Sequence, residues 1–200
     1  MNASSIEGFL ASSPLYLDVE TTGLKADYGL ALVIGVSPYK ARGPSPVKQF
    51  IIDYRALNWE KAERKMLTDF RAYMEGRTSI ITFNGTRFDV PYLQARLAAQ
   101  GLPLLPKMRH LDLFYTVKRT FGYTITSRRA KYIQSLFRVG DKTAPFKDSS
   151  QIMTWLRATF ARDRSAMLRI IDHNRNECLK SLSYQTRRLI ALVPRTVPFR

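Results

Sequence analysis

The sequence contains a single cysteine and only two histidines, and its 16 acidic residues are outnumbered by 32 lysines and arginines. One cysteine excludes an intramolecular disulfide and a cysteine-rich zinc site, and it fits a reducing compartment. No segment approaches the roughly 18 apolar residues that a membrane-spanning helix needs. Residues 1–13 also lack the basic and apolar regions of a signal peptide. We therefore expect a soluble, cytoplasmic protein that does not bind membranes.

The excess of positive charge is large and unevenly distributed. The formal net charge is +16; residues 101–200 carry 20 basic and 6 acidic side chains, whereas residues 1–100 carry 12 and 10. So much like charge repels itself within a compact fold and favours a polyanionic partner, of which nucleic acid is the natural candidate. A structural protein of a nucleoprotein particle would show the same excess. Charge alone therefore predicts binding to a phosphate backbone, but it indicates no reaction and no protein partner.

Apolar periodicity and turn residues divide the chain into alternating elements. Two hundred residues with 45% hydrophobic content can build one sizeable core, so we expect a single domain over residues 1–193 and a frayed tail over 194–200. Strands are expected at residues 15–20, 30–37, 47–53, 79–83 and 108–111. Helices are expected at residues 58–76, 90–100, 112–121, 130–137, 151–162 and 166–192. This order predicts an α/β fold, in which helices flank a mixed central sheet made of an antiparallel meander and parallel strands, with a helical C-terminal part.

Two acidic residues interrupt the apolar strand expected at residues 15–20. Side chains two apart on a strand point to the same face, so Asp18 and Glu20 present their carboxylates together, while Leu17 and Val19 face the other way. Mg²⁺ or Mn²⁺, hard cations that prefer oxygen ligands, would neutralise such a pair. Exposed strands often carry acids two apart, so the pair alone does not establish a site. The apolar setting favours a function, because an uncompensated charge there is costly.

A second acidic position lies in the segment NGTRFDVPYL at residues 84–93. Asp89 precedes a helix whose first turn contains Pro91, which is an ordinary arrangement for a helix N-cap. The same position suits a metal ligand. We expect the positive end of the helix to lower the pKa of the Asp89 carboxyl and to keep it ionised.

The third acidic position lies on the long helix expected at residues 166–192. His173 and Glu177 are four residues apart, so an α-helix places them on one face. The apolar stripe beside them is expected to consist of Leu168, Ile171, Cys178 and Leu182. A histidine that accepts a proton from water and a carboxylate that binds metal would then project together. Such a pair is also a common surface contact. Asp172 is the alternative acid, but it projects about 100° from His173 around an α-helix.

Four short motifs follow one another along the chain: DVETTGL at residues 18–24, NGTRFDVPYL at 84–93, HLDL at 110–113 and HNRNE at 173–177. In this order they resemble the motifs of DEDD exonucleases, the DnaQ-like branch of the ribonuclease H-like fold. The second motif is most similar to the subgroup typified by YprB-like proteins. The resemblance extends from about residue 15 to residue 182. It implies a ribonuclease H-like fold and 3′-5′ exonuclease activity.

The resemblance also assigns roles to the acidic residues. It implies that Asp18, Glu20, Asp89 and Glu177 hold two metal ions, Mg²⁺ or Mn²⁺, and that His173 orients or deprotonates the attacking water. The family usually ends its last motif in aspartate. Glu177 is one methylene longer, and catalysis is sensitive to displacements of about 1 Å. This departure leaves open a catalytically weakened module that binds nucleic acid with the same fold.

We expect contacts to nucleic acid from residues in the first two motifs and from a basic group later in the sequence. The resemblance places Thr22 and Leu24 near the terminal nucleotide, and we add Asn84 and Arg87 from the second motif. The basic group consists of Arg128, Arg129, Lys131, Arg138, Lys142 and Lys147, with Tyr123, Tyr132 and Phe137 interleaved. Such side chains contact phosphates and stack on bases, although the aromatic ones fit a hydrophobic core equally well.

These patterns predict a metal-dependent nuclease of DNA or RNA that acts on a single-stranded 3′ end by a two-metal-ion mechanism. Direction and exonucleolytic action rest on the resemblance, because the carboxylates themselves would cut internal bonds equally well. A structure-specific endonuclease is therefore the nearest alternative. Asp112, in the third motif, is expected to cap the helix that follows rather than to bind metal, with a supporting contact behind the metal site as the alternative.

Overall fold

A five-stranded mixed sheet forms the centre of the computed structural model, which describes residues 6–43, 45–136, 150–161 and 163–192. Its strand order is β3-β2-β1-β4-β5. The strands are β1 (Leu15–Thr21), β2 (Ala31–Pro38), β3 (Lys48–Ile51), β4 (Ser79–Thr82) and β5 (Arg109–Asp112). The first three strands are antiparallel, β4 is parallel to β1, and β5 is parallel to β4. The expected mixed sheet is thus confirmed.

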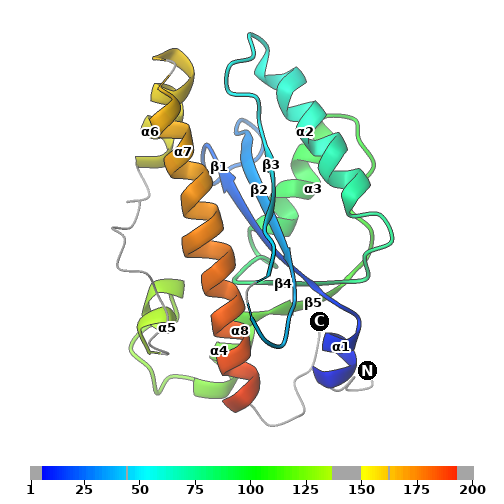
Figure 1. Ribbon diagram of the computed structural model, residues 1–200, viewed down its shortest axis with the longest axis vertical. Helices are drawn as coiled ribbons and strands as arrows, with labels where there is room; N and C mark the ends of the chain where they lie inside the picture. Colours follow the sequence, from blue (N-terminus) through cyan, green and yellow to red (C-terminus); the bar gives the residue numbers. More distant parts are fainter. Residues whose placement is uncertain (1–5, 44, 137–149, 162, 193–200) are drawn as a thin grey trace.

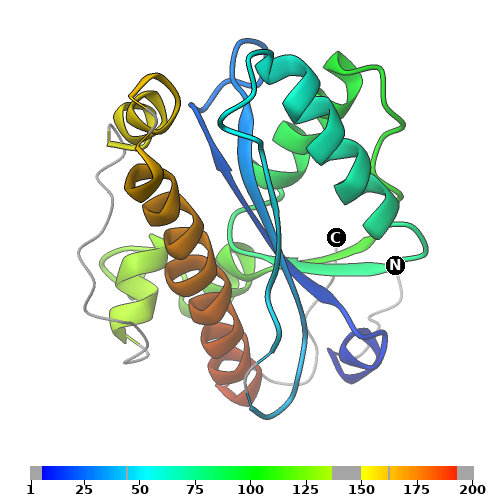
Figure 2. The ribbon, with the colours of Figure 1, turned by 45° about the horizontal axis from the view of Figure 1, so that its top comes forward.

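Helices cover both faces of this sheet (Figures 1 and 2). Helices α2 (Trp59–Tyr73) and α3 (Asp89–Ala99) lie on one face. A long helical run crosses the other face and consists of α7 (Arg164–Asp172), the π-helix η1 (His173–Lys180) and α8 (Ser181–Leu192). The other described helices are α1 (Ile6–Ala11), α4 (Leu113–Phe121), α5 (Ala130–Leu136) and α6 (Ser150–Phe160). The sequence did not predict α1; residues 137, 162 and the expected tail at 194–200 lie outside the described residues.

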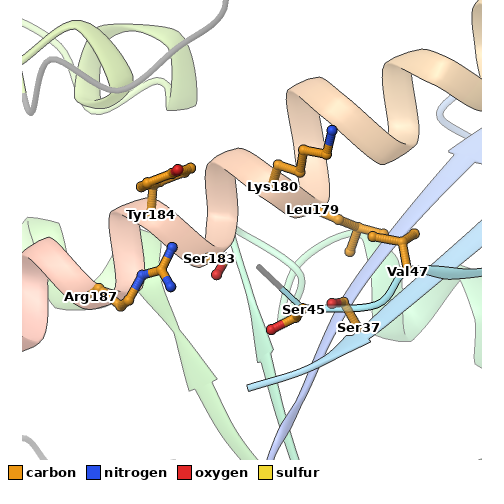
Figure 3. A pocket seen from close by; sticks show the side chains of 8 residues that line it. All are labelled: Ser37, Ser45, Val47, Leu179, Lys180, Ser183, Tyr184 and Arg187. Atoms are coloured by element: carbon orange, nitrogen blue, oxygen red, sulfur yellow. The ribbon is translucent and has the colours of Figure 1, made fainter. Parts of the chain in front are cut away.

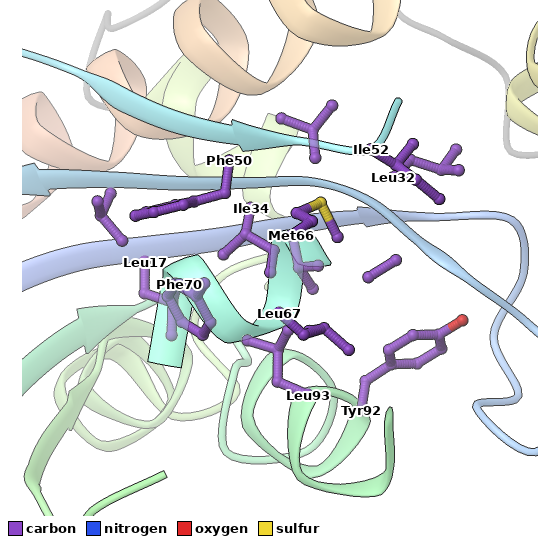
Figure 4. Packing of buried hydrophobic residues seen from close by; sticks show 14 of the residues in the cluster. Leu17, Leu32, Ile34, Phe50, Ile52, Met66, Leu67, Phe70, Tyr92 and Leu93 are labelled. Atoms are coloured by element: carbon purple, nitrogen blue, oxygen red, sulfur yellow. The ribbon is translucent and has the colours of Figure 1, made fainter. Parts of the chain in front are cut away.

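The main core lies between the sheet and α2 and α3 (Figure 4). Helix α2 begins at the N-cap Asn58, whose side chain accepts a hydrogen bond from the Lys61 backbone N–H at 2.9 Å. Its buried side chains include Met66, Leu67 and Phe70. From the sheet, the core receives Leu17, Leu32, Ile34, Phe50 and Ile52. A polar cap and a one-sided apolar stripe therefore account for both the position and the orientation of α2.

Strand β1 divides its side chains between the two faces of the sheet. Leu17 and Val19 belong to the core beneath α2 and α3. Tyr16, on the other face, packs in a second core with Leu179 of η1 and Leu182 of α8. Because side chains alternate along a strand, the side chains of residues 18 and 20 share the face of Tyr16 and point toward the C-terminal helical run.

The C-terminal run is not the uninterrupted α-helix that the sequence predicts for residues 166–192, because residues 173–180 form a π-helix. Leu168 is 44% exposed, so its expected place in a buried apolar stripe is wrong. Leu182, expected in the same stripe, is buried, and the run also buries Met167, Ile170, Asn174 and Leu179. A π-helix forms hydrogen bonds from i to i+5, and such segments often occur at functional sites.

No helix among the described residues is long and apolar enough to cross a membrane.

Candidate active site

Strands β1 and β4 pair only at the first two residues of β1, and Asp89 contacts β1 beyond this pairing. The parallel pairing is limited to Leu15 with Ile80 and Tyr16 with Ile81. Further along β1, the backbone N–H of Val19 donates instead to Asp89 Oδ1 at 3.0 Å. This hydrogen bond holds the first residue of α3 against β1, beyond the carboxyl end of β4. Ligands of open α/β sheets bind in this region, outside the carboxyl ends of the strands.

Three carboxylates, those of Asp18, Glu20 and Asp89, lie near this end of β1. Glu20 is 4% exposed and Asp89 is 5% exposed, whereas Asp18 is partly exposed. Burial and, next in size, the charge of Asp18 raise the pKa of Asp89 well above its usual range. The expectation that the helix terminus lowers this pKa is wrong, because backbone hydrogen bonds offset only part of the effect of burial and of the neighbouring charge. A bound cation would remove that repulsion.

His173 begins the π-helix and lies beside Glu20. Its Nε2 is 3.9 Å from Glu20 Oε1, and the histidine side chain is 14% exposed. The structure therefore brings His173 to the same end of β1 as the acids of the first motif. Glu177 lies on the same π-helix, but its side chain is outside the described set. The roles of His173 and Glu177, and of Asp172 as an alternative, remain predictions.

Asn174 connects the π-helix to the sheet directly at Asp18. Its Nδ2 donates to Asp18 Oδ2 at 2.9 Å, and its Oδ1 accepts from Gln49 Nε2 at 2.9 Å. Asn174 is fully buried. Asp18, Gly35 and Gln49 are successive partners across β1, β2 and β3, so Asn174 lies above one row of the sheet. Sequence reasoning missed Asn174 and Gln49; a glycine inside strand β2 was the available signal of a close approach.

The loop that carries the second motif is held by Asp112. The Asp112 carboxylate accepts hydrogen bonds from the backbone N–H groups of Asn84 at 2.7 Å, Thr86 at 3.0 Å and Phe114 at 3.0 Å. The last contact caps α4, as the sequence predicted. Asn84 has a φ of 64°, a left-handed conformation that asparagine adopts more readily than most residues. Asp112 thus fixes the turn that leads into Asp89.

The residues expected to contact nucleic acid occupy different environments. Thr22 closes the loop after β1, because its Oγ1 accepts from the Leu30 backbone N–H at 2.9 Å and its own N–H donates to the Leu30 carbonyl at 3.0 Å. Leu24, in this loop, is 82% exposed. Arg87 is exposed and Asn84 is half-buried. Leu24 and Arg87 are therefore accessible to a ligand, whereas the Thr22 side chain is engaged with the Leu30 backbone.

The expected basic group is only partly described. Arg128 lies over the ring of Tyr123, with its Cζ 5.4 Å from the ring centroid, and Tyr123 is 91% exposed. Arg129 is also exposed. Lys131 is on α5, but its side chain is outside the described set. Phe137, Arg138, Lys142 and Lys147 lie outside the described residues.

A second basic feature is a pocket of about 250 Å³ between α8 and the connection from β2 to β3 (Figure 3). Its lining residues are Ser37, Ser45, Val47, Leu179, Lys180, Ser183, Tyr184 and Arg187. Two cations and several hydroxyl groups suit an anion such as phosphate. Leu179 also packs over Gly35, so the pocket is on the same face of the sheet as Asn174. The sequence analysis did not single out Lys180 or Arg187.

The side chains near the end of β1 have the donor chemistry that a hard divalent cation prefers. Carboxylate oxygens are the ligands that Mg²⁺ and Mn²⁺ prefer, and Mg²⁺ commonly binds through one or two carboxylates while it keeps several waters. Among the described side chains, no group of three His, Cys, Asp or Glu is close enough to hold a metal ion. The acids that could contribute are Asp18, Glu20 and Asp89.

Comparisons with known proteins agree with this architecture. The model of the RNase H superfamily matches residues 15–185. No curated protein sequence matches the chain. A family B DNA polymerase from the hyperthermophilic archaeon Pyrobaculum calidifontis is similar in structure, with a TM-score of 0.55 and 15% identity over 89% of this chain and 24% of the polymerase chain.

Structures of exonuclease I are similar as well. One has a TM-score of 0.52 and 11% identity over 80% of this chain and 43% of its own. E. coli exonuclease I in complex with a dT13 oligonucleotide has a TM-score of 0.51 and 13% identity over 91% of this chain and 45% of its own. The chain therefore spans less than half the length of each of these proteins. At such low identities, the likeness is one of fold.

Proposed function

Because the chain belongs to the RNase H superfamily, whose model covers residues 15–185, we propose that it is a metal-dependent nuclease that removes nucleotides from a 3′ end. Membership of the family also confirms the expected ribonuclease H-like fold. The observation that carries the proposal is the placement of two pairs near one end of β1, Asp18 with Asp89 and Glu20 with His173. These four side chains come from three separate segments, and burying such polar groups without a function would be costly.

Asp18, Glu20, Asp89 and Glu177 are the residues that would hold two Mg²⁺ or Mn²⁺ ions. Bound there, the ions would supply an activated water and charge stabilisation for the leaving 3′ oxygen. The protein itself contributes the positions of these acids. Asp89 is held by the Val19 backbone N–H, and Asp18 is held by Asn174. Asparagine at either position keeps an oxygen that can accept these hydrogen bonds, so Asp18→Asn or Asp89→Asn is expected to remove metal binding without dismantling the sheet.

His173 is proposed to accept a proton from the attacking water. An imidazole is suited to this task near neutral pH, provided that it is held close to the water. The position of His173 beside Glu20 at 3.9 Å and its partial exposure at 14% support this role. The Glu20 carboxylate beside the ring would also stabilise the positively charged imidazolium that forms when His173 takes up the proton.

Nucleic acid is the proposed substrate, with a single-stranded 3′ end of DNA or RNA at the acids. The net charge of +16 supports this choice. The exposed side chains of Leu24 and Arg87 lie in the loops that carry the first two motifs, where they would contact the terminal nucleotides. Arg128 with Tyr123, and the pocket with Lys180 and Arg187, would contact the phosphates and bases further along the strand.

The direct test is cleavage of oligonucleotides labelled at the 3′ or the 5′ end, single- or double-stranded, DNA or RNA, with Mg²⁺, Mn²⁺ or EDTA. We expect metal-dependent release of labelled mononucleotide from the 3′ end and a ladder of shortened products from the 5′-labelled strand. Asp18→Asn should abolish both. The matched control is Asp69→Asn, because Asp69 is an exposed acid on α2 that pairs with Lys65.

The same assay identifies the alternatives. Cleavage of a circular strand, or internal fragments as the first products, would indicate an endonuclease and overturn the proposed direction. Binding of oligonucleotides by both wild type and Asp18→Asn, without any cleavage, would indicate a binding module and overturn the enzyme. Cleavage that persists in Asp18→Asn would mean that the products come from another protein or another site.

A further inference from the structure

A chain of two side-chain amides runs across the sheet to Asp18. Gln49 Nε2 donates to Asn174 Oδ1 at 2.9 Å, and Asn174 Nδ2 donates to Asp18 Oδ2 at 2.9 Å. Asn174 Nδ2 also lies 3.4 Å from the Asp18 carbonyl oxygen. We propose that Asn174, oriented by Gln49, is a positioning residue that fixes the Asp18 carboxylate for metal binding. This inference rests on the proposed metal-dependent function and extends it to residues outside the acidic motifs.

The direction of each hydrogen bond in this chain follows from Asp18. An ionised carboxylate only accepts hydrogen bonds, so Asn174 must present its NH₂ group to Asp18 and its oxygen to Gln49. Gln49 must in turn present its own NH₂ group. Gln49 Nε2 also donates to the Ile171 carbonyl oxygen at 2.9 Å, in the last turn of α7. One glutamine on β3 therefore fixes both the Asn174 amide and the junction between α7 and η1.

The close approach that this contact needs is built into strand β2. A Cβ atom on Gly35 would lie 2.1 Å from Asn174 Oδ1 and 2.6 Å from Leu179 Cδ1. Only glycine leaves room for the asparagine at this point of the sheet. Asn174 is fully buried, and a buried amide without partners is costly, so its hydrogen bonds also make its burial tolerable.

Residues that hold metal ligands in place commonly change metal affinity by about 10–100-fold when they are replaced. Asn174→Leu keeps a similar volume in the buried site but cannot donate to Asp18. We expect Mn²⁺, measured by the electron paramagnetic resonance signal of the free ion, to bind Asn174→Leu about 10–100-fold more weakly than wild type. Gln49→Met should weaken binding less. The double variant should be no weaker than Asn174→Leu, because Gln49 acts through Asn174.

The matched control is Gln94→Met, which removes a similar glutamine contact away from Asp18. Gln94 Oε1 accepts from the Leu105 backbone N–H at 2.9 Å. Thermal unfolding in EDTA reports the structural effect of every variant. A merely structural role for Asn174 would lower the unfolding temperature in EDTA and leave the Mn²⁺ affinity of the folded protein unchanged, as expected for Gln94→Met.

Three outcomes separate the possibilities. Weaker Mn²⁺ binding by Asn174→Leu, with wild-type affinity for Gln94→Met, supports the inference. Equal Mn²⁺ affinity for wild type and folded Asn174→Leu overturns it and leaves the nuclease proposal intact if wild type cleaves. Failure of wild type both to bind Mn²⁺ and to cleave overturns the proposed function and, with it, the premise of the inference.

Discussion

Glu63 on α2 forms a buried ion pair with Arg96 on α3, and Arg96 also contacts the loop that follows β1. Its carboxylate accepts hydrogen bonds from Arg96 Nη2 at 2.5 Å, Gln100 Nε2 at 2.9 Å and the Ala31 backbone N–H at 2.8 Å. Glu63 is fully buried and Arg96 is 6% exposed. Arg96 Nη1 also donates to the Ala26 carbonyl oxygen at 2.8 Å, within the loop that carries Leu24. Glu63→Ala leaves the guanidinium and two further donors without their carboxylate.

Removal of one member of a buried ion pair typically destabilises a protein by about 3–5 kcal/mol. We expect this magnitude for Glu63→Ala, since the remaining Arg96 charge stays buried on α3. In a chain of 200 residues, this corresponds to a fall of roughly 6–20 °C in the melting temperature. Urea unfolding followed by circular dichroism measures the free energy directly.

Glu60→Ala is the matched control, because Glu60 lies in the first turn of the same helix and is exposed. Its loss removes only a favourable helix-terminus charge, which contributes about 0.3–1 kcal/mol. A loss of less than about 1 kcal/mol for Glu63→Ala, with an unchanged slope against urea, would refute the reasoning. Such a result would mean that the free-energy cost of removing the pair from water cancels the attraction between its two charges completely.

Two further predictions concern Gly35 in strand β2 and His110 in strand β5. Gly35→Ala should destabilise the protein by about 1–3 kcal/mol in urea unfolding, because the new methyl group overlaps Asn174 and Leu179. His110→Gln should flatten the dependence of the unfolding free energy on pH. Burial lowers the pKa of His110 from 6.5, so the unfolded chain takes up the proton first, and the contribution of the neutral ring is lost as pH falls below about 6.5.

Each of these predictions has its own control. Gly23→Ala adds a methyl group where nothing lies within 4 Å, so it should leave stability nearly unchanged. An equally small loss of stability for Gly35→Ala would contradict the close approach of Asn174 to Gly35. For His110, wild type and His110→Gln are compared between about pH 5 and pH 8, near the ordinary histidine pKa. Parallel curves for the two proteins would show that the imidazole titrates alike in the folded and unfolded chains.

The sheet and its acids were predictable because their signals are local. Strand β1 combines an apolar run with alternation, and this pattern alone places Asp18 and Glu20 on one face. Helix α2 carries its own cap and stripe. The Asp112 cap was predictable for the same reason, since an aspartate just before a helix commonly accepts a backbone N–H.

Long-range contacts were not predictable in this way. The pKa of Asp89 is raised by burial and, next, by the charge of Asp18, which lies 71 positions earlier in the sequence and becomes a neighbour only in the folded chain. Glu63 has the sequence setting of any acid near the start of a helix, and its burial follows from Arg96 and Ala31. The partners of Asn174 come from two different strands.

The π-helix explains why the buried face of the C-terminal helical run was predicted only in part. Asn174 and Leu179 are five residues apart, and both are buried against the sheet. On an α-helix, residues five apart point about 140° away from each other, so no α-helical phase buries both. A π-helix widens the turn and brings them to one face. The π-helix lies where Asn174 reaches Asp18. Its geometry breaks the α-helical pattern expected from the sequence and also allows Asn174 to contact the site.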